Sequence, residues 1–267
     1  MASPLPRLAT LSLVGLALGG VVALVVHGPI PQPDAYHAFA DARPGLGIPT
    51  AADVLSNLGF LVVGIAGLRA VVRARRDARA PEPSETRAFA CYAAGIAVTA
   101  VGSVVYHLDP TNASLVFDRL PMTFAFCAFA TLVVGERVSA RAGRRALVPL
   151  LLAGVGSVLA WAVTLQFSPG GDLRAYAFVK YAIPAGAVVL LLAVPEPRAT
   201  RAPIVLALVT FALATGFELG DGAVFRATEG AVSGHTVKHL VASLAAAFPL
   251  GWFARRRDLR AGLAAGR

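Results

Sequence analysis

Residues 88–107 read AFACYAAGIAVTAVGSVVYH, an apolar run with polar side chains at its end. No charged side chain precedes His107 in the run. A helix needs about 20 apolar residues to cross a bilayer, so the run is long enough to span one. Polar and ionisable side chains are costly in lipid and usually mark a functional site. Because Ser103 and His107 lie at the end of the run, the stretch predicts a membrane helix that ends in such a site.

Similar apolar runs recur along all 267 residues of the chain. The predicted spans are residues 8–26, 53–72, 88–107, 116–135, 146–165, 174–194, 203–220 and 235–253. Only 15% of the residues are charged and 57% are hydrophobic, whereas an average soluble domain has about 25% charged residues. A soluble protein of this composition could not cover its surface with polar side chains. The sequence therefore predicts an all-α, polytopic membrane helical bundle with eight spans and no soluble domain.

The basic residues alternate between the predicted loops. Arginines gather after the second, fourth and sixth spans and in the tail after the eighth: Arg73, Arg75, Arg76, Arg79, Arg87, Arg137, Arg141, Arg144, Arg145, Arg198, Arg201, Arg255, Arg256, Arg257, Arg260 and Arg267. The intervening loops hold few basic residues and several acids. The positive-inside rule then places both termini in the cytoplasm. The net charge of +9 is explained by membrane orientation, and nucleic acid is not a predicted partner.

The first apolar run could be a signal peptide, because Arg7 precedes it. Its apolar core is longer than a typical signal core, and Val26-His27-Gly28-Pro29 follows it in place of a small-residue cleavage site. We therefore expect a retained first helix. Cys91 and Cys127 lie inside predicted helices without metal-binding spacing, and we expect them to be small packing residues.

Five polar residues fall at one membrane depth in this topology: Ser103, His107, Asp118, His235 and His239. They come from the outer ends of the third, fourth and eighth spans. Random placement among eight spans would scatter them over both faces. We therefore expect these residues to form one site.

The residue types in this set are those of a catalytic zinc site. His235 and His239 are four apart and project from one helical face, and His107 could supply a third nitrogen. Three protein ligands leave the fourth zinc position for water, whose pKa zinc lowers to about 7. Ser103 could donate a hydrogen bond to a developing oxyanion. Asp118 could act as a general base and then as a general acid.

Each of these residues also has a structural interpretation. A membrane histidine near a helix end is often interfacial, and a membrane serine usually bonds the carbonyl four residues earlier. Asp118 could cap the fourth span or pair with Arg119. Pro121 is expected near the first turn of that span, where it could free a backbone carbonyl.

Further polar residues lie near the outer ends of the spans: Asp53, Ser56, Asn57, Lys180, Glu218, Asp221 and Lys238. The three that open the second span could support the site or bind a headgroup, or could only form caps and interhelical bonds. The two lysines are expected to snorkel towards the interface. Glu218 and Asp221 could add acidic character to the mouth of the site or be interfacial.

The order Ser-x3-His, an aspartate eleven residues after that histidine, and a late His-x3-His resembles the alkaline ceramidase family. This family belongs to a wider membrane-hydrolase superfamily with adiponectin-type receptors and GPI-lipid remodelling proteins. Ser56-Asn57 also resembles the start of the family's first core helix, and the resemblance covers about residues 50–253. It implies a seven-helix core that holds zinc through His107, His235 and His239, with Ser103 and Asp118 beside the metal. It also implies hydrolysis of the amide of a ceramide-like lipid to a fatty acid and a sphingoid base.

The resemblance divides the chain into three parts. Residues 1–52 form an extra membrane helix with an outer loop, residues 53–253 the seven-helix core, and residues 254–267 a basic cytoplasmic tail. The acidic, tryptophan-containing segment that binds calcium in eukaryotic members is not visible. The stretch 27–52 has Asp34 and Asp41 but no tryptophan, so a calcium site is doubtful.

The leading functional hypothesis is a zinc-dependent lipid amidase whose substrate enters sideways from the membrane. The composition favours a bacterial member in the inner membrane, with its site near the periplasmic face. No obligate protein partner is inferred. The alternatives are a hydrolase of another lipid amide or ester, and a receptor-like or lipid-binding protein with a structural zinc site. A haem protein is a further alternative, although histidines one turn apart are poorly placed to ligate opposite haem faces.

Overall fold

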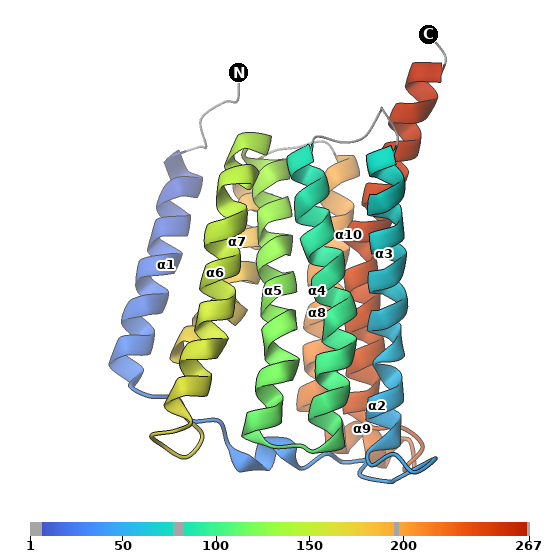
Figure 1. Ribbon diagram of the computed structural model, residues 1–267. Coiled ribbons are helices and arrows are strands. Elements are labelled where there is room, and N and C mark those ends of the chain that lie inside the picture. The colour runs from blue at the N-terminus through green and yellow to red at the C-terminus, as the bar shows by residue number, and fades with distance from the viewer. Residues whose placement is uncertain (1–6, 77–82, 195–197, 266–267) are drawn as a thin grey trace.

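The computed structural model describes residues 7–76, 83–194 and 198–265, and it shows a bundle of long helices (Figure 1). The long helices are α1 (Arg7–His27), α3 (Leu58–Arg76), α4 (Pro83–Leu108), α5 (Asn112–Arg137), α6 (Ala140–Thr164), α7 (Arg174–Ala193), α8 (Arg198–Leu219) and α10 (Gly234–Ala265). The short ones are η1 (Asp34–His37), α2 (Ala51–Ser56) and α9 (Asp221–Ala227). These residues include no β-strand. The predicted all-α bundle is confirmed.

Eight segments of the described chain are long and apolar enough to cross a membrane, and each contains most of one predicted span. Their bounds differ where a polar side chain caps a helix. The fourth span begins at Asn112, because the Thr111 side chain accepts from the Ser114 amide in a capping box. The fifth begins at Ala140, because the Ser139 side chain accepts from the Ala142 amide. A hydropathy pattern does not detect such caps.

The second span is broken near its start, between α2 and α3. The Asn57 side-chain amide and the Ser56 hydroxyl each donate to the Asp53 carbonyl at 2.8 Å. Side chains that bond the local backbone in this way compete with the regular helical pattern. All three residues are buried, so the break turns polar groups towards the interior of the bundle.

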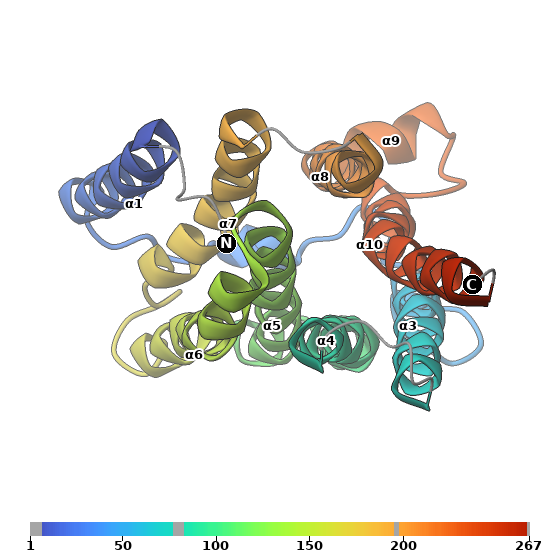
Figure 2. The same ribbon diagram turned by 90° about the horizontal axis from the view of Figure 1, so that it is seen from above.

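The helices form an incomplete ring (Figure 2). Helix α4 packs between α3 and α5, α5 packs against α6 and α7, and α10 packs against α3 and α8. Within the described residues, α7 and α8 are not among the closely packed pairs. Helix α1 lies outside this ring and packs against α7.

Small residues allow the helices of the ring to approach closely. A Cβ added at Gly64 of α3 would lie 2.6 Å from the Cα of Ala97 in α4. One added at Gly154 of α6 would lie 2.6 Å from the sulfur of Cys127 in α5. Membrane helices commonly pack through such residues, because lipid provides no hydrophobic drive for association. Cys127 is buried in this contact, in agreement with its expected packing role.

The first residues of α1 and the last residues of α10 lie at one end of the bundle (Figure 1). The arginines at the end of α3 and at the start of α6 lie at the same end. The structure thus agrees with the predicted alternation of loops, while the cytoplasmic assignment of this end stays a prediction. We call the opposite end the site end.

A cap segment, residues 28–50, crosses the site end (Figure 1). Hydrogen bonds anchor it from its start to its end: the Gln32 amide donates to the Gly170 carbonyl at 2.9 Å, the Ala40 amide to Asp221 at 2.9 Å, and the Thr50 hydroxyl to the His107 carbonyl at 2.8 Å. Within the segment, two hydrogen bonds of 2.7 Å from the Arg43 guanidinium hold the pKa of Asp41 below its usual value. The cap segment is therefore a fixed part of the fold.

The contact at Gly64 can be tested by adding one methyl group. We expect Gly64→Ala to lower the melting temperature of the detergent-purified protein, because its Cβ would meet the Ala97 backbone and overpacking costs about 1–3 kcal/mol. Gly15→Ala is the matched control, since nothing lies within 4 Å of that position. Tryptophan fluorescence during heating measures both variants. Equal melting temperatures would contradict the proposed close contact.

Candidate metal centre and active site

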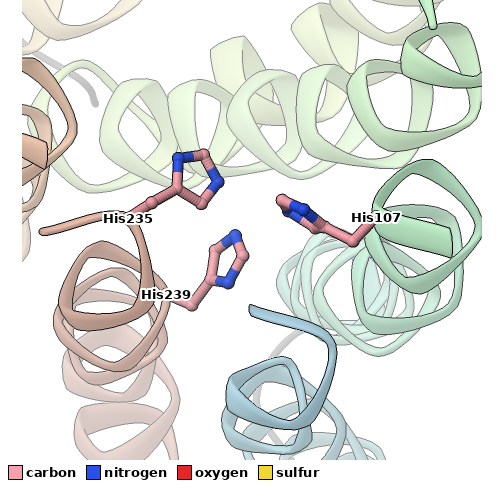
Figure 3. Close-up of side chains that lie close together, drawn as sticks. All are labelled: His107, His235 and His239. Atoms are coloured by element: carbon pink, nitrogen blue, oxygen red, sulfur yellow. The ribbon is translucent and has the colours of Figure 1, made fainter. Parts of the chain in front are cut away.

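The three histidines of the sequence motif meet between α4 and α10 (Figure 3). Their ring centroids are 5.0, 5.0 and 4.8 Å apart for His107–His235, His107–His239 and His235–His239. One nitrogen from each ring lies within 4.8 Å of the other two. All three side chains are buried. The predicted convergence of three imidazoles from two distant parts of the chain is confirmed.

This group fits a metal ion. The Nδ1 atom of His107 is buried and has no hydrogen-bond partner, an arrangement that is costly unless another group satisfies it. Zinc bonds to imidazole nitrogens at about 2.0–2.1 Å, so small rotations of the rings would let one ion reach all three. Among the described residues, no other group of three or more His, Cys, Asp or Glu side chains lies this close together.

A serine from the broken second span orients one of the imidazoles. The Ser56 oxygen lies 2.8 Å from Nδ1 of His239, while its hydrogen is donated to the Asp53 carbonyl. Ser56 therefore accepts from the Nδ1–H of His239, and this leaves the Nε2 lone pair of that ring free. Metal-binding histidines are usually fixed by such a partner on the other nitrogen. Ser56 thus supports the site, as one of the two sequence interpretations allowed.

Two aspartates hold the start of α10 in place. The Thr236 hydroxyl donates to one oxygen of Asp53 at 2.6 Å, which joins α10 to α2. The backbone amide of His235 donates to Asp221 at 2.8 Å, and the other oxygen of Asp221 accepts from the cap segment. Both acids therefore position the backbone that carries His235 and His239.

Ser103 and Asp118 lie beside the histidines. Ser103 of α4 and Asp118 of α5 line one cavity with His239. The structural alternative in which Asp118 caps the fourth span is excluded, because Thr111 caps α5 and Asp118 lies in the second turn. Both side chains are buried, so they face the interior and not the lipid.

A glycine and a proline bring these two residues together. Pro121 lies inside α5, in its third turn and not its first, and a proline leaves the carbonyl four residues earlier without its helical donor. That carbonyl belongs to Phe117, and Gly102 of α4 lies so close to it that a Cβ at Gly102 would clash. Because Ser103 follows Gly102 and Asp118 follows Phe117, this close approach places the two polar side chains next to each other.

An aromatic residue of the cap segment covers the histidines. The Phe39 ring centroid lies 4.7 Å from that of His107 and 4.6 Å from that of His235. His37 nearby hydrogen-bonds the Tyr106 hydroxyl at 2.8 Å and the Asn112 side chain at 3.1 Å. The sequence interpretation missed both residues. The one signal in the sequence was that Tyr36-His37-Ala38-Phe39 contains the aromatic and imidazole side chains of the loop.

Lys238 was expected to snorkel, and this expectation is wrong. Its ammonium group donates to Glu218 at 2.9 Å, and its side chain is only 13% exposed. Glu218 also accepts from the Tyr36 hydroxyl at 2.9 Å. Burial, and then the charge of Glu218, raise the pKa of Tyr36 well above its ordinary value, so Tyr36 stays a donor.

The cavity at the site continues into a second, apolar cavity. The two share six lining residues: Phe60, Thr99, Met122, Lys180, Phe211 and Ala242. The apolar cavity extends past Phe126, Ile183 and Leu208, which belong to α5, α7 and α8. A polar chamber beside the histidines therefore opens into an apolar chamber where α7 and α8 are not closely packed.

Comparison with known proteins identifies the family of the chain. None of the curated protein sequences matches the chain. The sequence matches the Ceramidase family over residues 49–254, a range that includes the three histidines, Ser103 and Asp118. The match supports a ceramide-hydrolysing membrane enzyme. On this evidence from most of its length, the chain belongs to the Ceramidase family.

Proposed function

We propose that the chain is a zinc-dependent integral-membrane hydrolase that cleaves the amide bond of a ceramide-like lipid to a fatty acid and a sphingoid base. The observation that carries the proposal is the buried histidine triad beside Ser103 and Asp118 in a cavity that continues into an apolar chamber. The positive-inside rule supports a site at the periplasmic face of a bacterial inner membrane.

His107, His235 and His239 would hold the zinc ion. Three imidazoles suit zinc, and three protein ligands are typical of catalytic rather than structural sites. When bound, zinc supplies Lewis-acid polarisation of a carbonyl and a water of lowered pKa. Ser56 keeps His239 in the tautomer that presents Nε2.

Asp118 would move the proton. It accepts the proton that the attacking water loses as the bond between its oxygen and the amide carbon forms. It then gives the proton to the amide nitrogen as the carbon–nitrogen bond breaks, so the products are a carboxylic acid and an amine. Ser103, which lines the same cavity, would donate to the carbonyl oxygen as negative charge develops there.

The acyl chain would occupy the apolar chamber. Its walls come from α5, α7 and α8 among other helices, and within the described residues α7 and α8 are not a closely packed pair. A lipid could therefore enter sideways from the bilayer between these two helices. Phe39 and the rest of the cap segment cover the site end, which keeps bulk water from the histidines.

The metal can be tested with one histidine variant. We expect the detergent-purified protein to contain about one zinc ion per chain, and His235→Ala to lose both the metal and fatty-acid release. Elemental analysis and lipid-product detection measure the two properties. His27→Ala, at the exposed end of α1, is the control that should keep both. After chelation, zinc should restore turnover and calcium should not, because calcium prefers oxygen ligands. Full turnover by a zinc-free His235→Ala protein would contradict the proposal.

The proton-transfer role predicts a different result for Asp118→Asn. This variant keeps the size of the side chain but cannot accept a proton, so we expect kcat to fall by about 10²–10⁴-fold while zinc content stays normal. Asp109→Asn, an exposed acid at the same end of the bundle, is the matched control. Unchanged kcat in Asp118→Asn would exclude the role. Absence of turnover in the wild type would favour a receptor-like protein with a structural metal.

The position of the Phe39 ring over His107 and His235 predicts how fast a chelator removes the metal. We expect Phe39→Ala to release zinc to an added chelator severalfold faster than the wild type, because water would reach His107 and His235 from the site end. Absorbance of a zinc indicator dye follows this release. Phe167→Ala, which changes a ring that is 81% exposed, should release zinc at the wild-type rate. Equal rates for both variants would show that the Phe39 ring does not shield the metal.

A further inference from the structure

Arg119 lines the polar chamber and has an unused hydrogen-bond donor. One terminal nitrogen, Nη2, donates to the Gln32 side chain at 2.6 Å, whereas Nη1 is buried without any hydrogen-bond partner. The residue is only 6% exposed, so bulk water does not satisfy this nitrogen. A buried donor without a partner is costly. Arg119 therefore lacks an acceptor that the protein itself does not supply.

The positive charge of Arg119 is stabilised by aromatic rings. Its guanidinium carbon lies 4.6 Å from the ring centroids of both Trp161 and Tyr176, and 5.6 Å from that of Tyr36. A cation near the face of such a ring is attracted by the ring electrons, and the attraction is stronger where water is excluded. The three rings thus supply part of the stabilisation that a carboxylate would otherwise give. What Nη1 still needs is a hydrogen-bond acceptor, and this acceptor can be uncharged.

Glu218 lines the same chamber and has an unused acceptor. Both hydrogen bonds that it accepts, from Tyr36 and from Lys238, end on its Oε1 atom, each at 2.9 Å. Among the described residues, no donor bonds its second oxygen, Oε2. Tyr36 links the two unused groups, because its ring lies near the Arg119 guanidinium and its hydroxyl bonds Glu218. The chamber thus offers a donor and an acceptor around Tyr36.

This combination of unused groups matches hydroxyl groups. A hydroxyl both accepts and donates, so it can accept from Nη1 of Arg119 or donate to Oε2 of Glu218. A carboxylate or phosphate could only accept, and the negative charges of Glu218 and Asp118 in the chamber would repel it. In a ceramide-like lipid, the carbon attached to the amide nitrogen lies between two carbons that each carry a hydroxyl. An uncharged lipid of this kind therefore brings the missing partners close to the amide.

We infer that Arg119 and Glu218 are specificity-determining residues that bind the hydroxyl groups of the sphingoid base. The inference rests on the proposed hydrolase function and places the amine half of the lipid in the polar chamber. Hydrogen bonds that involve a charged group are stronger than those between neutral groups. A site built to bond a hydroxyl strongly rejects an analogue that lacks it, because the buried groups of the site are then left unpaired.

A purely structural role for Arg119 predicts something else. If the residue only fastens the cap segment through Gln32, its replacement should lower stability and slow the hydrolysis of every lipid by the same factor. The ratio of kcat/KM between two lipids separates the roles, because a loss of folded protein affects both rates alike. Gln32→Ala removes this fastening and keeps the guanidinium, so the variant should retain the wild-type ratio.

The test compares three lipids that share one palmitoyl amide and one base chain: N-palmitoylsphinganine and its 1-deoxy and 3-deoxy analogues. The wild type should hydrolyse at least one deoxy lipid with a kcat/KM about tenfold or more below that of the parent lipid. Arg119→Met, which keeps a long side chain but has no donor, should bring this ratio towards one. Glu218→Gln replaces one acceptor oxygen by a donor nitrogen; it should also reduce the ratio, and it serves if Arg119→Met does not fold. Arg226→Met, at an exposed position outside the chamber, should keep the wild-type ratio.

The deoxy lipid that is hydrolysed more slowly identifies the hydroxyl that is bound. A wild type that hydrolyses both deoxy lipids as fast as the parent lipid, or a preference that persists in both chamber variants, would overturn the inference. Equal slowing of all three lipids by Arg119→Met would assign this residue to the cap segment alone and would also overturn it. If the wild type hydrolyses none of them, the proposed function fails, and calorimetric binding of the same lipids then decides the inference. Tighter binding of the parent lipid to the wild type but not to Arg119→Met would support it, and equal binding of all three lipids to the wild type would overturn it.

Discussion

The structure depends on one constraint: three imidazoles, a carboxylate and a hydroxyl must be buried within an apolar bundle, where the surrounding lipid cannot form hydrogen bonds with them. The bundle meets this constraint by supplying partners from several helices. Ser56 satisfies one nitrogen of His239, and Asp221 accepts from the amide of His235. One nitrogen of each histidine lies within 4.8 Å of the other two, and a metal ion bound between the rings would satisfy these atoms.

The sequence predicted the features that depend on local pattern. Apolar run length located all eight spans, and the four-residue spacing of His235 and His239 placed both on one face of α10. The alternation of arginine-rich loops predicted that His107 lies at the same membrane depth as these two histidines. These signals are reliable because membrane helices need a minimum apolar length and because helical periodicity fixes which residues share a face.

The remaining features depend on contacts between distant residues, which one sequence does not reveal. The cover formed by Phe39 arises because the cap segment is tied to Gly170 and Asp221, residues far along the chain. Lys238 was misassigned because its partner, Glu218, lies on another helix. The break at Asn57 was missed because hydropathy does not register a side chain that bonds its own backbone. The local sequence pattern thus predicted the residues of the site, whereas tertiary contacts determine which residues surround them.

The geometry of α10 links the metal to the choice of lipid. His235, Lys238 and His239 are spaced i, i+3 and i+4, so one turn of about 5.4 Å carries two histidines of the triad and part of the wall of the polar chamber. An amide held at the triad would therefore lie within roughly one helical turn of the polar wall that Lys238 forms. This distance suits a lipid whose amide nitrogen is joined almost directly to its polar head, as in ceramide. A lipid with its amide deep in the acyl chain would place either the amide or the headgroup in the wrong chamber.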